Sequence, residues 1–76
     1  MKTTAAVRRT RLAETRKARG YSQAKLAKRL GVATSTIARI ELGDLDPSVS
    51  TALAIAKALD RRVEFLFADD APEAGR

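Results

Sequence analysis

Residues 21–43 of the chain read YSQAKLAKRLGVATSTIARIELG, which is two short amphipathic helical patterns separated by one glycine. In the first pattern Ser22 is a good N-cap, and Tyr21 and Leu26 have the spacing of a hydrophobic staple, so a helix is predicted to begin at the residue after the serine. Gly31 is expected to end that helix, because glycine adopts the left-handed conformation that turns the chain sharply. The stretch therefore predicts two helices joined by a tight turn.

The second helix of this pair has an outward face of small side chains. On a wheel of about 100° per residue, Ile37 and Ile40 lie on one side with the aliphatic part of Glu41. The opposite side holds Thr34, Ser35, Ala38, Arg39 and Leu42. Small residues let a helix approach the floor of a DNA major groove, and an arginine can bind a guanine edge through two hydrogen bonds. An ordinary solvated helix face is the alternative interpretation.

Positive charge is concentrated in the first half of the chain. The net charge is +6, but residues 1–39 contain eleven Lys or Arg and a single acid, Glu14, whereas residues 40–76 contain four cations and eight acids. A basic half is what a phosphate-binding surface requires. Basic residues that merely solvate helices are the competing explanation, which the helix pair makes less attractive.

Length and composition exclude several classes of protein. A chain of 76 residues makes one domain with a small core. Without cysteine or histidine it has no disulfides, thiolate catalysis, imidazole bases or the usual zinc sites. No stretch is apolar enough to span a membrane and the N-terminus lacks the apolar core of a secretory signal, so a soluble cytoplasmic protein is expected. No enzyme activity, cofactor or metal is expected either, because the acids are scattered and the hydroxyl groups lack a base.

Further helices are predicted on both sides of the central pair. A first helix is expected from about residue 5 to residue 18, with Leu12 on its buried face and a stop at Gly20. The basic side chains expected around it are Arg8, Arg9, Arg11, Arg16 and Lys17. Gly, Asp and Pro in residues 43–47 predict a loop, after which Ser48 caps a fourth helix. The apolar stripe of that helix is expected to be Val49, Leu53, Ala56 and Leu59.

The segment 62–67 fits one face of a short helix or one face of a strand, and we favour the helix. Phe65 is then left over, which indicates an interface, although it could also cap the core. The candidates for a dimer interface are Phe65, Leu66 and Phe67. Residues 1–7 are expected to form an N-terminal extension that runs into the first helix, and residues 68–76 a mobile acidic tail.

An ordered set of short motifs carries a family resemblance: Ser22-Gln23, Leu26-Ala27, Leu30-Gly31-Val32, Ser35-Thr36-Ile37, Arg39-Ile40-Glu41, Gly43, Pro47-Ser48 and Ile55-Ala56-Lys57-Ala58-Leu59. With these motifs the chain resembles the Xre/Cro class of lambda-repressor-like helix-turn-helix domains over roughly residues 8–67. The resemblance implies an all-α fold, a compact bundle of five short helices with a central helix-turn-helix. It also implies binding to double-stranded operator DNA, usually as a homodimer, with the third helix in the major groove.

The resemblance also implies roles for individual residues. Base edges would be contacted by Thr34, Ser35 and Arg39. Phosphates would be contacted by Gln23, Thr36, Arg19 and Lys28. Arg16 and Glu41 match a structural ion pair that joins the first helix to the end of the third. A solvated first-turn residue is the alternative for Gln23.

The chain departs from the family pattern at several positions. Leu42 stands where the family often has a polar residue that contacts phosphate. Asp44 and Asp46 occupy a loop that is basic in many relatives, so this loop either stands away from the DNA or lowers the affinity. Thr15 replaces a usual core leucine, and Asp60 replaces a usual helix-ending glycine.

These observations lead us to expect a sequence-specific DNA-binding transcriptional regulator. We expect it to be a repressor that binds an inverted-repeat operator as a homodimer. The alternative is an antitoxin or another interaction module, which binds a partner protein such as a toxin and uses DNA binding for autoregulation. The acidic loop and the aromatic residues at 65–67 motivate that alternative.

Overall fold

The computed structural model of the chain describes residues 8–70, and the predictions for residues 1–7 and 71–76 lie outside this range. Five α-helices and a final 3₁₀ turn follow one another along the chain. They are α1 Thr10–Ala18, α2 Gln23–Leu30, α3 Thr34–Leu42, α4 Val49–Leu59, α5 Val63–Leu66 and η1 Ala68–Asp70. The part of the chain that the structure describes contains no strand. The predicted all-α bundle of five short helices is confirmed.

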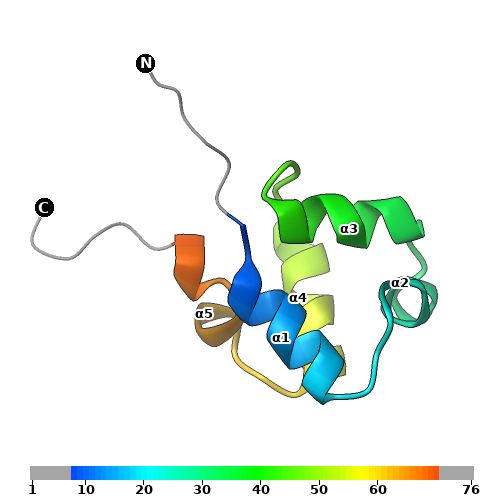
Figure 1. The fold of residues 1–76 in the computed structure, drawn as a ribbon, viewed down its shortest axis with the longest axis horizontal. Coiled ribbons are helices and arrows are strands. Elements are labelled where there is room, and N and C mark those ends of the chain that lie inside the picture. The colour runs from blue at the N-terminus through cyan, green and yellow to red at the C-terminus, as the bar shows by residue number, and fades with distance from the viewer. Residues whose placement is uncertain (1–7, 71–76) are drawn as a thin grey trace, which may run out of the picture.

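The helices surround one small core to which each of them contributes. Its buried side chains are Leu12, Leu26, Ala27, Ile37, Ile40, Ile55, Ala56, Leu59 and Leu66. The most extensive contact is between α2 and α3, while α4 packs against both α2 and α5. Figure 1 shows α3 along one edge of the bundle, with α1, α4 and α5 on its inner side. The arrangement leaves the outer side of α3 uncovered by any other helix of the described residues.

The predicted boundaries of α2 are confirmed. The Ser22 hydroxyl accepts a hydrogen bond of 3.0 Å from the backbone N–H of Lys25, as an N-cap does. At the other end Gly31 has φ of 74°, the left-handed conformation that only glycine adopts without steric cost. Ser48 caps α4 in the same way as Ser22 caps α2, through a bond of 3.1 Å from the N–H of Thr51.

The start of α1 was predicted too early. The helix begins at Thr10, and Arg8 and Arg9 precede it without helical structure. The reason is at Arg9, whose backbone N–H donates to the Glu41 carbonyl oxygen at 2.8 Å and whose φ and ψ of −91° and 71° are not helical. A tertiary hydrogen bond to the end of α3 has replaced the continuation of the helix.

The predicted apolar stripe of α4 is half wrong. Val49 and Leu53 are 78% and 53% exposed, whereas Ile55 and Leu59 are fully buried beside Ala56. The buried side of α4 is therefore rotated from the predicted one. The many alanines of α4 allow more than one apolar stripe to be drawn, and packing against α2 and α5 selects the stripe through Ile55.

The ambiguous segment 62–67 contains the short helix α5, as favoured. Its Leu66 side chain is fully buried in the core, so the prediction of Leu66 as a dimer contact is wrong. Phe67 is partly buried against the same core, while Phe65 is 39% exposed beneath the Arg11 guanidinium, 4.6 Å from the ring centre. Residues 68–70, expected in the tail, form the turn η1.

Within residues 8–70, no helix has both the length and the apolar character that crossing a membrane would require.

Candidate nucleic-acid interface

The outward face of α3 carries the residues predicted to contact bases. Thr34, Ser35 and Arg39 are all exposed, and Ala38 between them is half-buried. Ile37 and Ile40 on the opposite side of the helix are 1% exposed, so the two faces of α3 are sharply different. Ala33 precedes the helix and makes no side-chain cap, which leaves the first N–H groups of α3 without a cap of that kind. The outward face is therefore polar at Thr34, Ser35 and Arg39, while Leu42 at its far end is an exposed apolar side chain.

A buried ion pair fixes α3 to the first helix. Arg16 donates from Nε to Glu41 Oε2 at 2.5 Å and from Nη2 to Oε1 at 3.2 Å. Both side chains are more than nine-tenths buried, and the remaining Nη1 of Arg16 donates to the carbonyl oxygen of Tyr21 at 2.8 Å. The pair that the family resemblance implied is present as a two-pronged contact, the geometry in which arginine and carboxylate interact most specifically.

The third partner of this carboxylate is Gln23, at the start of α2. Its amide Nε2 donates to Glu41 Oε1 at 2.9 Å. The structure thus uses Gln23 to join α2 to α3, and its amide oxygen is not part of that bond. Contact of Gln23 with phosphate stays a prediction, as it does for the half-buried Thr36 on α3 and the exposed Lys28 on α2.

A shallow hollow between α1 and the outward side of α3 brings two further cations to this surface. Its lining includes Arg8 and Lys17 together with Gln23, Ala38 and Leu42, and also the carboxylate residues Glu14 and Glu41. Sequence reasoning did not assign these two cations to phosphate. The pattern that could have found Lys17 is the spacing of Thr10, Ala13 and Lys17, which share one face of α1 and all line the hollow.

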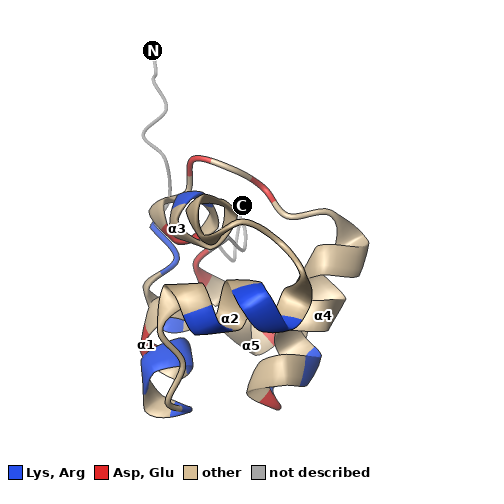
Figure 2. Cartoon of the chain, turned by 90° about the vertical axis from the view of Figure 1, so that its right-hand side faces the viewer, with Lys and Arg blue, Asp and Glu red and all other residues tan. Residues whose placement is uncertain are grey.

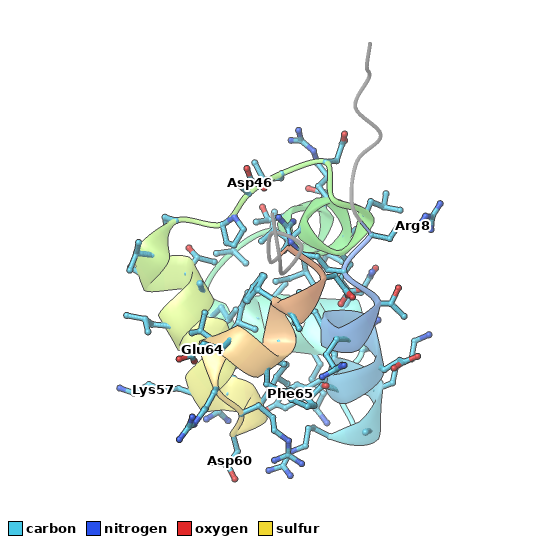
Figure 3. The ribbon with its side chains drawn as sticks, turned by 90° about the vertical axis from the view of Figure 1, so that its left-hand side faces the viewer. Arg8, Asp46, Lys57, Asp60, Glu64 and Phe65 are labelled. Carbon is cyan, nitrogen blue, oxygen red and sulfur yellow. The ribbon has the colours of Figure 1, made fainter. Side chains whose placement is uncertain are left out.

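Arg19 is not brought to the same surface. Its guanidinium lies 3.6 Å from the carboxylate of Asp60, which follows α4. Figure 3 places Asp60 at the opposite end of the molecule from α3, whereas Arg8 and Asp46 lie at the α3 end. The structure therefore groups Arg19 with the end of α4, and contact of Arg19 with phosphate stays a prediction.

The acidic loop after α3 lies beside the predicted reading face, and its carboxylates have arginine partners. Asp44 Oδ2 is 3.6 Å from Nε of Arg39, and Asp46 Oδ1 is 2.7 Å from Nη2 of Arg9. Figure 2 shows the two acidic positions on the loop that leads away from α3. The loop does stay close to α3, because the N–H groups of Asp44 and Leu45 both donate to the Arg39 carbonyl oxygen.

The buried position of Arg9 was missed from the sequence. Its side chain is 3% exposed, although it was expected among the basic side chains around α1. Leu12 and Arg16 lie on the inward face of α1, and Arg9, directly before the helix, extends this helical spacing by three residues. That spacing could have indicated burial of Arg9, but the sequence does not show which groups would accept hydrogen bonds from its guanidinium.

Comparisons with known proteins agree with this geometry. A sequence profile of the family described as Helix-turn-helix matches residues 12–66. The chain is 42% identical over 65 residues to an uncharacterised HTH-type transcriptional regulator of Archaeoglobus fulgidus, covering 86% of this chain and 93% of the relative. It is 48% identical over 48 residues to the uncharacterised HTH-type transcriptional regulator YgzD of Bacillus subtilis, covering 63% of this chain and 73% of that protein.

A solved structure supports the same assignment. The crystal structure of the restriction-modification controller protein C.AhdI from Aeromonas hydrophila superposes with a TM-score of 0.70 at 38% sequence identity. The match covers 76% of this chain and 88% of that one. The profile match spans more than half of the chain, and the resemblance to the Xre/Cro class is confirmed. The chain belongs to the helix-turn-helix family.

Proposed function

We propose that this protein is a DNA-binding transcriptional regulator that represses by occupying an inverted-repeat operator as a homodimer. The observation that carries the proposal is the outward face of α3, where Thr34, Ser35 and Arg39 are exposed on a helix whose other side is locked into the core. An exposed helix of small residues with one arginine suits the major groove. The names of the related proteins, which are transcriptional regulators, support the same function.

In this proposal α3 reads bases and its surroundings hold the phosphates. Arg39 binds a guanine edge, and Thr34 and Ser35 contact neighbouring bases. Gln23, Thr36 and Lys28 contact the backbone, together with Arg8 and Lys17 from the hollow beside α3. These contacts fix the position of α3 without carrying sequence information themselves.

The homodimer follows from the small size of the reading surface. One module of this size covers only a few base pairs, and two copies on a symmetric site multiply the specificity. The exposed apolar side chains Val49 and Leu53 on α4 are our candidates for the contact between copies, together with the exposed Phe65. Leu53 lines an open groove between α4 and α5, in which apolar side chains such as Val63 lie among the charged residues Lys57, Asp60, Arg61, Arg62 and Glu64.

The experiment that tests this function is selection of bound sequences from a pool of random DNA duplexes at about 150 mM salt, where weak phosphate contacts are screened. The proposal predicts enrichment of a palindrome whose half-sites are about one helical turn apart. Enrichment of a single short half-site would contradict the proposed homodimer but not the proposed DNA binding. Binding that enriches no sequence and vanishes as the salt concentration rises would contradict the proposed function.

The second candidate is an antitoxin or a related interaction module that binds a partner protein. The exposed Val49 and Leu53 favour it, because the same apolar surface could receive another chain. It predicts that the isolated protein stays monomeric and that the groove between α4 and α5 is covered only in a complex with that partner.

A further inference from the structure

The guanidinium of Arg9 is built into the end of α3. Nη1 donates to the carbonyl oxygen of Ile40 at 2.7 Å and to that of Leu45 at 2.9 Å. Nη2 donates to Asp46 Oδ1 at 2.7 Å, and the guanidinium carbon lies 5.6 Å from the centre of the Phe67 ring. A side chain from before α1 thus joins the last turn of α3 to the loop that follows it.

The backbone of the same residue makes a second attachment to α3. The Arg9 N–H donates to the carbonyl oxygen of Glu41 at 2.8 Å. Ile40 and Glu41 belong to the last turn of α3, where carbonyl groups lack the partners that the helix interior supplies. The Ile40 carbonyl oxygen also accepts from the N–H of Gly43 at 3.1 Å. Arg9 therefore contacts two consecutive carbonyl groups at this end, one through its guanidinium and one through its backbone.

The loop held by Arg9 is the one that touches Arg39. The N–H groups of Asp44 and Leu45 donate to the Arg39 carbonyl oxygen at 2.9 and 3.2 Å, and the Asp44 carboxylate lies 3.6 Å from Nε of Arg39. Displacing the loop would therefore displace the surroundings of both the backbone and the side chain of Arg39.

We infer that Arg9 is a positioning residue for DNA reading: by holding the last turn of α3 and the loop after it, Arg9 sets the orientation in which α3 presents Arg39. This inference rests on the proposed function, in which Arg39 contacts bases. Hydrogen bonds to base edges weaken steeply with distance and angle. A small rotation of the last turn of α3 is therefore expected to lower the preference for the operator sequence more than the affinity for the phosphate backbone. Arginine is suited to the role because its planar fork donates from separate nitrogens in fixed directions, whereas lysine donates only from one nitrogen.

Arg9→Lys is the sharpest test, because it keeps the charge and removes the fork. The matched control is Arg11→Lys, an exposed arginine two residues further along with the same change. The affinity for the operator selected by the wild-type protein and for a scrambled duplex is measured for both variants at 10 °C. We expect Arg9→Lys to lower the ratio of the two affinities about tenfold with unchanged scrambled-duplex affinity, the size of one lost base contact. Arg11→Lys should leave the ratio unchanged.

Amide hydrogen exchange supplies a readout that does not depend on DNA. The N–H groups of Asp44 and Leu45 should exchange faster in Arg9→Lys than in the wild-type protein, while those of Leu26 and Ala27 in α2 should not. Equally faster exchange at all four of these N–H groups, or an Arg9→Lys variant that is unfolded at 10 °C, would show that Arg9 only stabilises the fold. That result would overturn the inference.

The two proposals fail in different ways. A folded Arg9→Lys variant with the ratio of the wild-type protein overturns the positioning role and leaves the proposed function intact. If the wild-type protein binds every sequence as it binds a scrambled duplex, the proposed function fails. Amide exchange at Asp44 and Leu45 in Arg9→Lys then still decides whether Arg9 holds this end of α3.

Discussion

At Glu41 the first three helices of the bundle meet in one side chain. Its carboxylate accepts from Arg16 of α1 and from Gln23 of α2, while its own backbone belongs to α3. Because the side chains of Arg16, Gln23 and Glu41 are all at least partly buried, their contacts with one another replace the contacts with water that burial removes. The orientation of α3 relative to α1 and α2 is therefore fixed by polar contacts as well as by the core.

We predict that Arg16→Met destabilises the protein by about 3–5 kcal/mol, because it leaves the Glu41 carboxylate buried without its cation. Urea unfolding followed by circular dichroism measures the loss. The matched double variant Arg16→Met with Glu41→Leu removes both charges and should recover much of it. If the single variant lost less than about 1 kcal/mol, the pair would behave as an exposed one, contrary to its burial.

The contact between Asp44 and Arg39 leads to a prediction about non-specific binding. We expect Asp44→Asn to raise the affinity for scrambled duplex by about twofold to fivefold at 50 mM salt, because a negative charge beside the proposed interface is removed. Fluorescence anisotropy measures the affinity. Asp60→Asn is the control, since Asp60 lies at the opposite end of the molecule from α3 (Figure 3). Equal increases in both variants would show that only net charge matters.

Single residues could be predicted from the sequence where a family position or a helix period specifies them. The pairing of Arg16 with Glu41 was anticipated, because both positions belong to a matched motif. The burial of Arg9 was not anticipated. Its acceptors are backbone carbonyl groups and Asp46, more than thirty residues away, and no local pattern encodes contacts of such separation.

At the level of single elements, the ends of the helices are where local sequence rules hold best. Ser22 and Ser48 cap α2 and α4 as expected. Asp60 ends α4 with a φ of 56° and is the one residue other than glycine with positive φ among residues 8–70. An L-residue in this left-handed region carries a conformational cost of about 1 kcal/mol.

We therefore predict that Asp60→Gly stabilises the fold by about 0.5–1 kcal/mol, which is roughly 3–6 °C in the midpoint of thermal unfolding for a domain of this size. The gain is reduced by the loss of the exposed contact with Arg19. Differential scanning calorimetry measures the shift. Asp60→Ala, which loses the same contact and keeps the strain, should be less stable than the wild-type protein. Stabilisation by alanine would rule out strain as the cause.

The orientation of α4 could not be predicted from its own sequence. Eleven residues that include four alanines and only one charged residue have apolar positions on every side. The stripe through Val49 and Leu53 and the stripe through Ile55 and Leu59 are both helical in spacing. Packing against α2 and α5 decides between them, and that information is spread over three segments of the chain.

On the scale of the whole molecule, the rotation of α4 leaves apolar surface without a partner. Val49 and Leu53 are exposed although the core is small and every helix contributes to it. A domain of this size gains stability when such surface is buried against a second copy. The dimer proposal therefore links the surface of α4 to the stability of the fold.

We predict that the midpoint of thermal unfolding rises with protein concentration for the wild-type chain and not for Leu53→Ser, because only an associated form is stabilised by mass action. Sedimentation at 1–100 μM, an order-of-magnitude range for a specific homodimer, gives the association state directly. Ala24→Ser, at an exposed position of α2, is the matched control and should behave as the wild-type protein does. Concentration-independent unfolding of the wild-type chain would contradict the dimer and favour the interaction module.

The measurement that most directly tests the central claim is the affinity of Arg39→Met for the selected operator and for its single base-pair variants. The account predicts that this variant loses about 1–3 kcal/mol of discrimination at one base pair in each half-site, at symmetry-related positions, and keeps discrimination elsewhere. A uniform loss across all the operator variants would contradict the claim that α3 reads bases through Arg39, because it would make Arg39 a phosphate contact.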